Sequence, residues 1–305
     1  MTNKSNRAKK LSIFRYCAPF SSKILGSNKL IYLCPICGQG FSEESVNNGE
    51  LTLEDVPPRS MGGRGLLLTC QKCNSQAGHK IEFYIKNQRD LQGFSQTLTG
   101  DNPTDEEKIS GNLLINDEKF SVNVQQKGER TEIEIIGKAN NPVKVDNLKD
   151  YLVSGSINNS LDGIELKVEK SVKFDSRLLK IALLKSGFLL ITAMLGYTYA
   201  LDKRLTIVRE QISNPEKNLL GSSFWIVPGK NQFFPNRCII SVSKPLPLFL
   251  VTYDDSAVIL PSPSSPVNLY TIMREWEKEK IVTITGSVYE WPRKAIMILD
   301  NQGQF

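Results

Sequence analysis

Histidine is nearly absent from this chain of 305 residues, in which His79 is the only imidazole side chain. A catalytic zinc site that uses two or three histidines therefore cannot form within one chain. A serine or cysteine nucleophile would have His79 alone to serve as its base. This shortage excludes multi-histidine metal sites and restricts any catalytic triad to one residue.

Acidic residues are missing from the first 42 positions, whereas seven lysines and arginines precede the first acid, Glu43. Residues 1–95 carry 13 basic and 7 acidic side chains, and therefore hold the whole formal net charge of +6. Residues 1–30 are expected to form a basic arm. Such an arm before a small domain indicates a polyanionic partner, most simply nucleic acid. A solvated terminus and a transit peptide are the alternatives.

A secretory signal is also lacking, because the first basic residues lead into no long apolar run. The longest apolar stretch, residues 181–201, is nearly long enough to cross a bilayer, but Lys185 and two glycines weigh against a membrane span. We expect a buried core helix that is capped by Asp175 or Ser176 and broken near Gly196. No membrane partner is expected.

Cysteine is scarce, and four of the six cysteines are paired in sequence. The lone Cys17 and Cys238 fit a reducing, cytoplasmic compartment. In a C-x-x-C turn, both thiolates reach one tetrahedral ion, and two such turns complete a closed site. The spacing predicts a structural zinc ion in preference to a redox motif. Its predicted ligands are Cys34, Cys37, Cys70 and Cys73.

The segment between the two cysteine pairs is longer than a zinc ribbon needs, which indicates an insertion. Residues 51–53 have strand character, and Pro57-Pro58 prevent the strand from continuing. A glycine-containing loop (59–65) and a second strand (66–69) follow, and the second cysteine pair begins a helix. The order predicts a ββα unit held together by zinc.

These residues resemble the HNH endonuclease family, also called ββα-metal or His-Me finger nucleases, in its Cys₄ zinc branch. The resemblance lies in C-P-I-C, L-T-L-E-D-V-P-P-R-S-M-G-G and L-T-C-Q-K-C-N-S-Q-A-G-H, within residues 31–85. It implies a divalent ion, Mg²⁺ or Mn²⁺, that Glu54 and Asn74 would hold. It also implies phosphodiester hydrolysis, with the ββα helix against the minor groove.

This chain departs from the family at the general base, because Asp55 stands where the family has histidine. Aspartate is the weaker base near neutral pH. Three interpretations stay open: Asp55 acts as metal ligand or weak base, His79 supplies the imidazole, or the site is inactive and only binds nucleic acid. His79 is equally a candidate for a helix-end cap or a phosphate contact. Four basic residues flank the site as candidate phosphate contacts or ordinary surface charges: Arg59, Arg64, Lys72 and Lys80.

The remaining chain predicts an α+β fold, in which antiparallel strands surround the buried helix. We expect an HNH-like zinc domain (31–95) and a C-terminal domain (96–305). The latter is expected to be β-rich at 110–172, helical at 175–213 and β-rich again at 220–305.

The leading hypothesis is a metal-dependent HNH-type endonuclease that acts on nucleic acid, with double-stranded DNA as the expected form. The second is a catalytically inactive nucleic-acid-binding zinc module with a regulatory or partner-binding C-terminal domain. The third is a zinc-stabilised interaction protein. The C-terminal domain is a candidate surface for a protein partner or for homo-oligomerisation. A role in bacterial defence or in a mobile element is suggested by family analogy alone.

Overall fold

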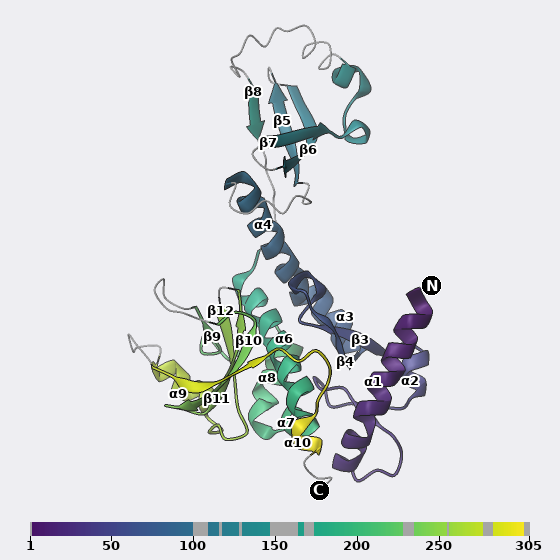
Figure 1. Ribbon diagram of the computed structural model, residues 1–305, viewed down its shortest axis with the longest axis vertical. Coiled ribbons are helices and arrows are strands. Elements are labelled where there is room, and N and C mark those ends of the chain that lie inside the picture. The colour runs from purple at the N-terminus through teal and green to yellow at the C-terminus, as the bar shows by residue number, and fades with distance from the viewer. Residues whose placement is uncertain are drawn as a thin grey trace. The chain divides into compact units, whose positions relative to one another are not determined.

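The computed structural model describes residues 2–99, 109–115, 118–127, 130–146, 164–167, 174–227, 235–254, 256–276 and 283–301. Helices and antiparallel sheets make up the chain, which confirms the expected α+β class (Figure 1). Two compact units are present. Unit 1 comprises Met1–Ile85 and Asp175–Phe305, and unit 2 comprises Lys86–Phe174.

The N-terminal segment of unit 1 is a helix, α1 (Thr2–Ile24), where the sequence suggested a basic arm. Phe14, Cys17 and Ala18 are fully buried, and their spacing of three and four residues forms one helical face. Tyr16 Oη donates a hydrogen bond to the carbonyl of Ile296, 2.9 Å away. The apolar face anchors α1 to the core, while Arg7, Lys9, Arg15 and Lys23 are exposed.

The segment that contains the cysteines folds as a ββα unit, in the order expected from the sequence. Gly63 permits the turn between its two long strands, because a Cβ there would lie 1.5 Å from the carbonyl oxygen of Pro57. A π-helical turn continues the helix. The elements are β1 (Tyr32–Leu33), β2 (Gly40–Phe41), α2 (Glu44–Asn47), β3 (Leu51–Val56), the 3₁₀ turn η1 (Arg59–Met61), β4 (Arg64–Cys70), α3 (Gln71–Ala77), the π turn η2 (Gly78–Glu82) and α4 (Phe83–Thr99).

A long apolar helix, α6 (Ser176–Leu195), forms the centre of unit 1 and has the expected boundaries. The Asp175 carboxylate caps it by accepting hydrogen bonds from the backbone amides of Arg177 and Leu178. Gly196, with φ of +102°, ends it. Three short helices follow: α7 (Tyr197–Ala200), η4 (Lys203–Leu205) and α8 (Thr206–Ser213).

Helix α6 is long and apolar enough to cross a membrane, but 89% of its most apolar window is buried inside the protein. A Cβ at Gly187 would lie 2.7 Å from Val258 Cγ2, so α6 packs closely against strand β12 (Ser256–Leu260). This is the arrangement of a core helix, as the sequence predicted.

The sheet beside α6 has five antiparallel strands in the order β13-β10-β11-β12-β9. The segment 295–299, one of the short apolar runs, does not form a strand here, because helix α10 begins at Ile298. The further elements are β9 (Trp225–Ile226), β10 (Cys238–Lys244), β11 (Leu248–Tyr253), α9 (Leu269–Trp276), β13 (Thr285–Glu290) and α10 (Ile298–Asn301).

Unit 2 contains a four-stranded antiparallel sheet in the order β7-β6-β5-β8. A small core of its own, which includes Phe120 and Val122, covers one face. The β-rich character expected for residues 110–172 agrees with these strands, although several positions of that range lie outside the described residues. The elements are β5 (Ile109–Ile115), β6 (Glu118–Lys127), β7 (Arg130–Ile135), the 3₁₀ turn η3 (Gly137–Ala139) and β8 (Ile164–Lys167).

The division into units differs from the one expected from the sequence. The ββα unit is not separate from the C-terminal region, because residues 175–305 pack with it in unit 1. Gln76 of α3, for example, donates a hydrogen bond from Nε2 to the carbonyl of Ser213 at 2.8 Å. Only residues 86–174 form a unit of their own, and they interrupt unit 1 as an insertion.

Candidate metal centre and the nuclease-like strand end

Four cysteine side chains converge at one point of unit 1. All four Sγ atoms lie within 4.8 Å of one another, and Cys37 and Cys70 are 3.8 Å apart. A tetrahedral ion with bonds of about 2.3 Å requires sulfur separations of about 3.8 Å. The cluster is therefore able to hold a metal ion, and it is the one such group of three or more candidate ligands within the described residues.

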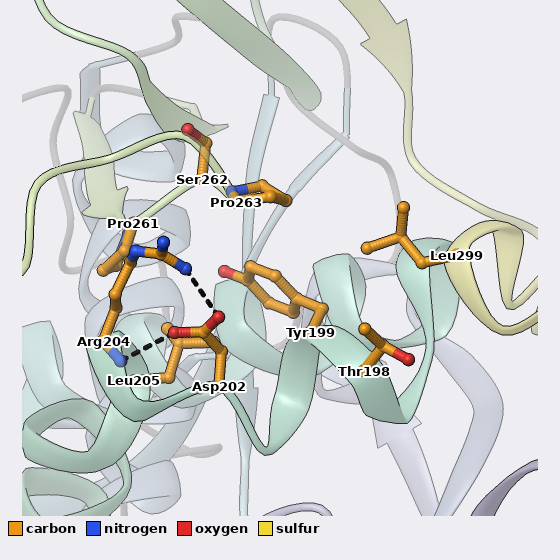
Figure 2. A pocket seen from close by; sticks show the side chains of 9 residues that line it. All are labelled: Thr198, Tyr199, Asp202, Arg204, Leu205, Pro261, Ser262, Pro263 and Leu299. Atoms are coloured by element: carbon orange, nitrogen blue, oxygen red, sulfur yellow. Dashed lines mark hydrogen bonds and ion pairs between the residues drawn. The ribbon is translucent and has the colours of Figure 1, made fainter. Parts of the chain in front are cut away.

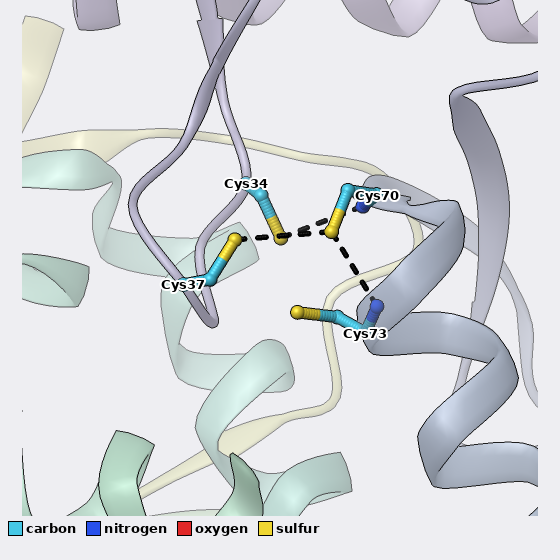
Figure 3. A group of neighbouring side chains, drawn as sticks. All are labelled: Cys34, Cys37, Cys70 and Cys73. Atoms are coloured by element: carbon cyan, nitrogen blue, oxygen red, sulfur yellow. Dashed lines mark hydrogen bonds between the residues drawn. The ribbon is translucent and has the colours of Figure 1, made fainter.

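Two local structures position these thiols (Figure 3). Cys34 and Cys37 lie in the turn between β1 and β2, where Gly38 adopts φ of +72° and its amide bonds to the carbonyl of Cys34. Cys70 ends β4 and caps α3, accepting a hydrogen bond from the Cys73 amide at 3.4 Å. The hydrogen bond to Cys34 lowers the pKa of Cys37 and that of Cys70, the latter to about 7. The same mutual hydrogen bonds raise the pKa of Cys34 and of Cys73, so two of the four groups are favoured as thiolates, the form that binds metals, and two as thiols.

Strand β3 begins at Leu51, which pairs with Cys70, and further along it Glu54 takes part in a buried ion pair that the sequence did not indicate. Both carboxylate oxygens of Glu54 are engaged: Oε1 accepts from Lys185 Nζ at 2.8 Å, and Oε2 accepts from Thr69 Oγ1 at 2.7 Å. Lys185 Nζ also lies 2.5 Å from Glu82 Oε1. The side chains of Lys185 and Glu54 are only 1% and 4% exposed. One ammonium group thus joins two carboxylates from β3 and η2.

Burial and neighbouring charges shift the pKa values of Lys185 and Glu82. Burial lowers the pKa of Lys185, but Glu54 and Glu82 outweigh burial, and the pKa is raised above its usual value. Burial also raises the pKa of Glu82, and the negative charges of Glu54 and Asp55 add to this, whereas Lys185 opposes it. Lys185 is consequently held in its charged form.

The other candidate ligands of a catalytic ion do not point to a common centre. Asp55 pairs through Oδ2 with Arg59 Nε at 2.6 Å. Asn74 donates from Nδ2 to Thr52 Oγ1 at 2.8 Å. His79 is exposed on η2. Among these expected ligands, Glu54 is the one whose two carboxylate oxygens both have protein partners, so its ion pair with Lys185 is what opposes a divalent ion here.

The four basic residues that flank the strand end differ in their surroundings. Arg64 and Lys72 are exposed, and neither has an ion-pair partner within the described residues. Arg59 is engaged by Asp55, and Lys80 lies 3.9 Å from Glu216. Exposed pairs of this kind are weak and exchange partners readily. All four remain accessible to an anionic ligand.

The sequence contains a signal for the role of Lys185 beyond its position as a charged residue within an apolar run. A cation placed among leucines and isoleucines must, however, find a carboxylate, because an unpaired buried charge is very costly. That signal predicts an acidic partner for Lys185, although it does not identify Glu54, which lies 131 positions earlier in the chain.

A second polar feature of unit 1 is a small cavity of about 50 Å³ beside α7 (Figure 2). Asp202 Oδ2 accepts from Arg204 Nη1 at 2.6 Å there, while the buried Tyr199 Oη and Arg204 Nε have no protein partner. A cavity of this size accommodates a few ordered water molecules, which satisfy such atoms. We therefore interpret it as a structural feature.

Comparison of the chain with protein-family models, curated proteins and solved structures gives no match. The resemblance to HNH nucleases therefore rests on the sequence motifs of residues 31–85.

Proposed function

We propose that this protein is a cytoplasmic, zinc-containing nucleic-acid-binding protein that retains an HNH-like ββα unit without using it for hydrolysis. The observation that carries this proposal is the engagement of both Glu54 oxygens by Lys185 and Thr69. An ammonium group against this carboxylate repels a divalent ion, and Asn74 faces Thr52 instead of Glu54. The chemistry of four thiols favours zinc as the structural ion.

Nucleic acid is the proposed ligand because the basic excess of residues 1–95 accounts for the whole net charge of the chain. Helix α1 buries an apolar face, and Arg7, Lys9, Arg15 and Lys23 are exposed beside the ββα unit. Exposed Arg64 and Lys72 add to this surface. Such side chains bind the phosphate backbone of DNA or RNA, with double-stranded DNA as the expected form. A protein partner or homo-oligomer through residues 96–305 stays a prediction.

Binding of the full-length protein to a labelled 20-base-pair DNA duplex should weaken steeply with salt. Each neutralised phosphate contributes about −0.9 to the slope of log K against log[salt], so Arg64 and Lys72 together should contribute about −2. Fluorescence anisotropy between 50 and 200 mM salt measures this slope. Substitution of both residues by alanine should reduce it, whereas Lys203→Ala, an exposed control, should not. Absence of affinity even at low salt would favour an interaction protein instead.

A metal-dependent nuclease is the second candidate, because Glu54 and Glu82 share Lys185 and Asp55 follows Glu54 in β3. Glu54 and Asp55 are both close enough to raise the pKa of Glu82. Hydrolysis would require a divalent ion to displace Lys185 from this cluster.

Plasmid nicking separates the two candidates. With Mg²⁺ or Mn²⁺, we expect the purified protein to nick supercoiled DNA no faster than its Glu54→Ala/Asp55→Ala variant does. Both proteins should retain DNA binding, which shows that the preparations are intact. Nicking by the wild type that disappears in the variant would establish the nuclease and refute the inactive site.

A further inference from the structure

A polar cleft of about 380 Å³ lies within unit 1, at the junction of the ββα unit and the five-stranded sheet. The loop between β3 and β4 forms one wall, through Gly62, Gly63 and Arg64. The segment before β10 and the segment after β13 form the other, because Cys238 and Glu290 are paired neighbours in the sheet. The cleft thus brings together three stretches that are distant in sequence.

Positive charge dominates the lining of this cleft. Three arginines, Arg64, Arg237 and Arg293, face one acidic side chain, Glu290. Arg64 and Arg293 are exposed, and within the described residues neither has an ion-pair or hydrogen-bond partner. Two guanidinium groups are therefore available to a ligand, and their planar forks match the oxygens of a phosphate group.

The third arginine is held in place by the protein. Arg237 Nε pairs with Asp254 Oδ1 at 3.1 Å. The backbone of Arg237 adopts φ of +52°, a value that residues other than glycine rarely take. Its Nη1 lies about 4.0 Å from the position that a Cβ on Gly62 would take. The unusual backbone conformation directs this guanidinium toward the glycine loop, and such conformations concentrate at binding sites.

A tryptophan side chain also lines the cleft. It belongs to Trp291, whose indole Nε1 is buried with no hydrogen-bond partner. Tyr253 packs against the ring, with centroids 5.7 Å apart. The three guanidinium groups call for a ligand rich in acceptors and negative charge.

We infer that this cleft binds a phosphate group, with Arg64, Arg237 and Arg293 as its donors. The inference deepens the proposed function and rests on it for the source of the phosphate, the backbone of a nucleic acid. A free nucleotide offers the same chemistry. The volume accommodates one nucleotide, since small-molecule sites typically span about 300–1,000 Å³.

The test compares Arg64→Ala/Arg293→Ala with the charge-matched control Lys203→Ala/Lys244→Ala, whose exposed lysines do not line the cleft. Circular dichroism first establishes that both variants fold. Anisotropy with the 20-base-pair duplex and tryptophan fluorescence with ATP then measure binding by the full chain. The arginine variant should lose at least about tenfold in DNA affinity, and its salt slope should fall by about 2. The lysine control should retain a higher DNA affinity and a steeper salt dependence than the arginine variant.

The two ligands separate the possible sources. Loss of ATP binding in the arginine variant, with DNA affinity equal to that of the control, would retain the phosphate site and assign it to free nucleotides. If the wild type binds no DNA but binds ATP more tightly than the arginine variant does, the proposed function is refuted and the phosphate site in the cleft is supported. If DNA binds and neither ligand distinguishes the arginine variant from the control, the cleft inference is overturned and the proposed function survives. If the wild type binds neither ligand, both fail.

Discussion

Replacement of Cys70 by serine should unfold the β1–β2 turn and the start of α3 and reduce the free energy of unfolding by about 5 kcal/mol or more. Structural zinc sites in small domains contribute on the order of 10 kcal/mol of apparent binding free energy, and here that energy ties two separate turns together. Serine is a good N-cap, so it replaces the hydrogen bond that Cys70 accepts from the Cys73 amide. The loss would therefore report on the metal bond.

Metal analysis and urea unfolding measure this result. The wild type should contain one zinc ion per chain and the Cys70→Ser variant none. Cys238→Ser is the matched control, because Cys238 is also buried but bonds to Thr252 outside the cluster. Its stability and zinc content should remain close to those of the wild type. A wild type that contains no metal, with a Cys70→Ser variant of equal stability, would refute the zinc site.

Local features of this fold follow closely from the sequence. The cysteine spacing predicts the thiol cluster, because a C-x-x-C turn leaves little choice of geometry. Asp175 and Gly196 predict the boundaries of α6, since a capping carboxylate and a glycine act within a few residues of the backbone. Alternation of apolar residues predicts β5, β6 and β7.

Long-range packing does not follow from such patterns. Helix α1 has a buried face at Phe14 and Cys17, but its polar composition suggested a free arm. The insertion of unit 2 between residues 85 and 175 conceals the fact that the ββα unit and α6 share one core. A periodic pattern shows that a face is buried, not which element covers it. The pairing of Glu54 with Lys185 depends on that missing information.

The candidate site was accordingly predicted in part. The family resemblance selects Glu54, Asp55 and Asn74; the structure places Glu54 and Asp55 within β3, which extends to Val56 instead of ending at residue 53, and Asn74 in α3. Their hydrogen-bond partners, Lys185, Arg59 and Thr52, differ from those a catalytic metal site requires. Roles as metal ligands or base stay predictions.

Replacement of Lys185 by methionine should reduce the free energy of unfolding by about 3–5 kcal/mol, because it leaves the carboxylates of Glu54 and Glu82 without their counter-charge. Methionine preserves the length of the side chain, so packing within α6 changes little. Lys180→Met, in the same helix, is the control and should cost less, because Lys180 is partly exposed and contacts Trp225 through a cation–π interaction alone. Urea unfolding of the full chain measures both.

Two further results distinguish charge from packing. Glu54→Gln/Glu82→Gln should restore much of the stability of Lys185→Met, since no unpaired buried charge then remains. The penalty for Lys185→Met should also shrink as the pH falls. Burial already raises the pKa of Glu82 in the folded protein, and Lys185 opposes this rise, so its removal raises the pKa further. A folded state whose carboxyl pKa is raised takes up protons more readily than the unfolded chain and gains stability as the pH falls toward the unfolded value.

The raised pKa of Lys185 has the complementary consequence. Its stabilising contribution is fully present below the pKa of an unfolded lysine, about 10.4, and is lost as the pH rises through the higher folded value.

The opposite result is a stability loss on Lys185→Met that is the same at pH 4 and pH 7 and that the Glu54→Gln/Glu82→Gln substitutions do not relieve. It would show that Lys185 stabilises unit 1 by packing alone and would remove the physical reason for an inactive metal site.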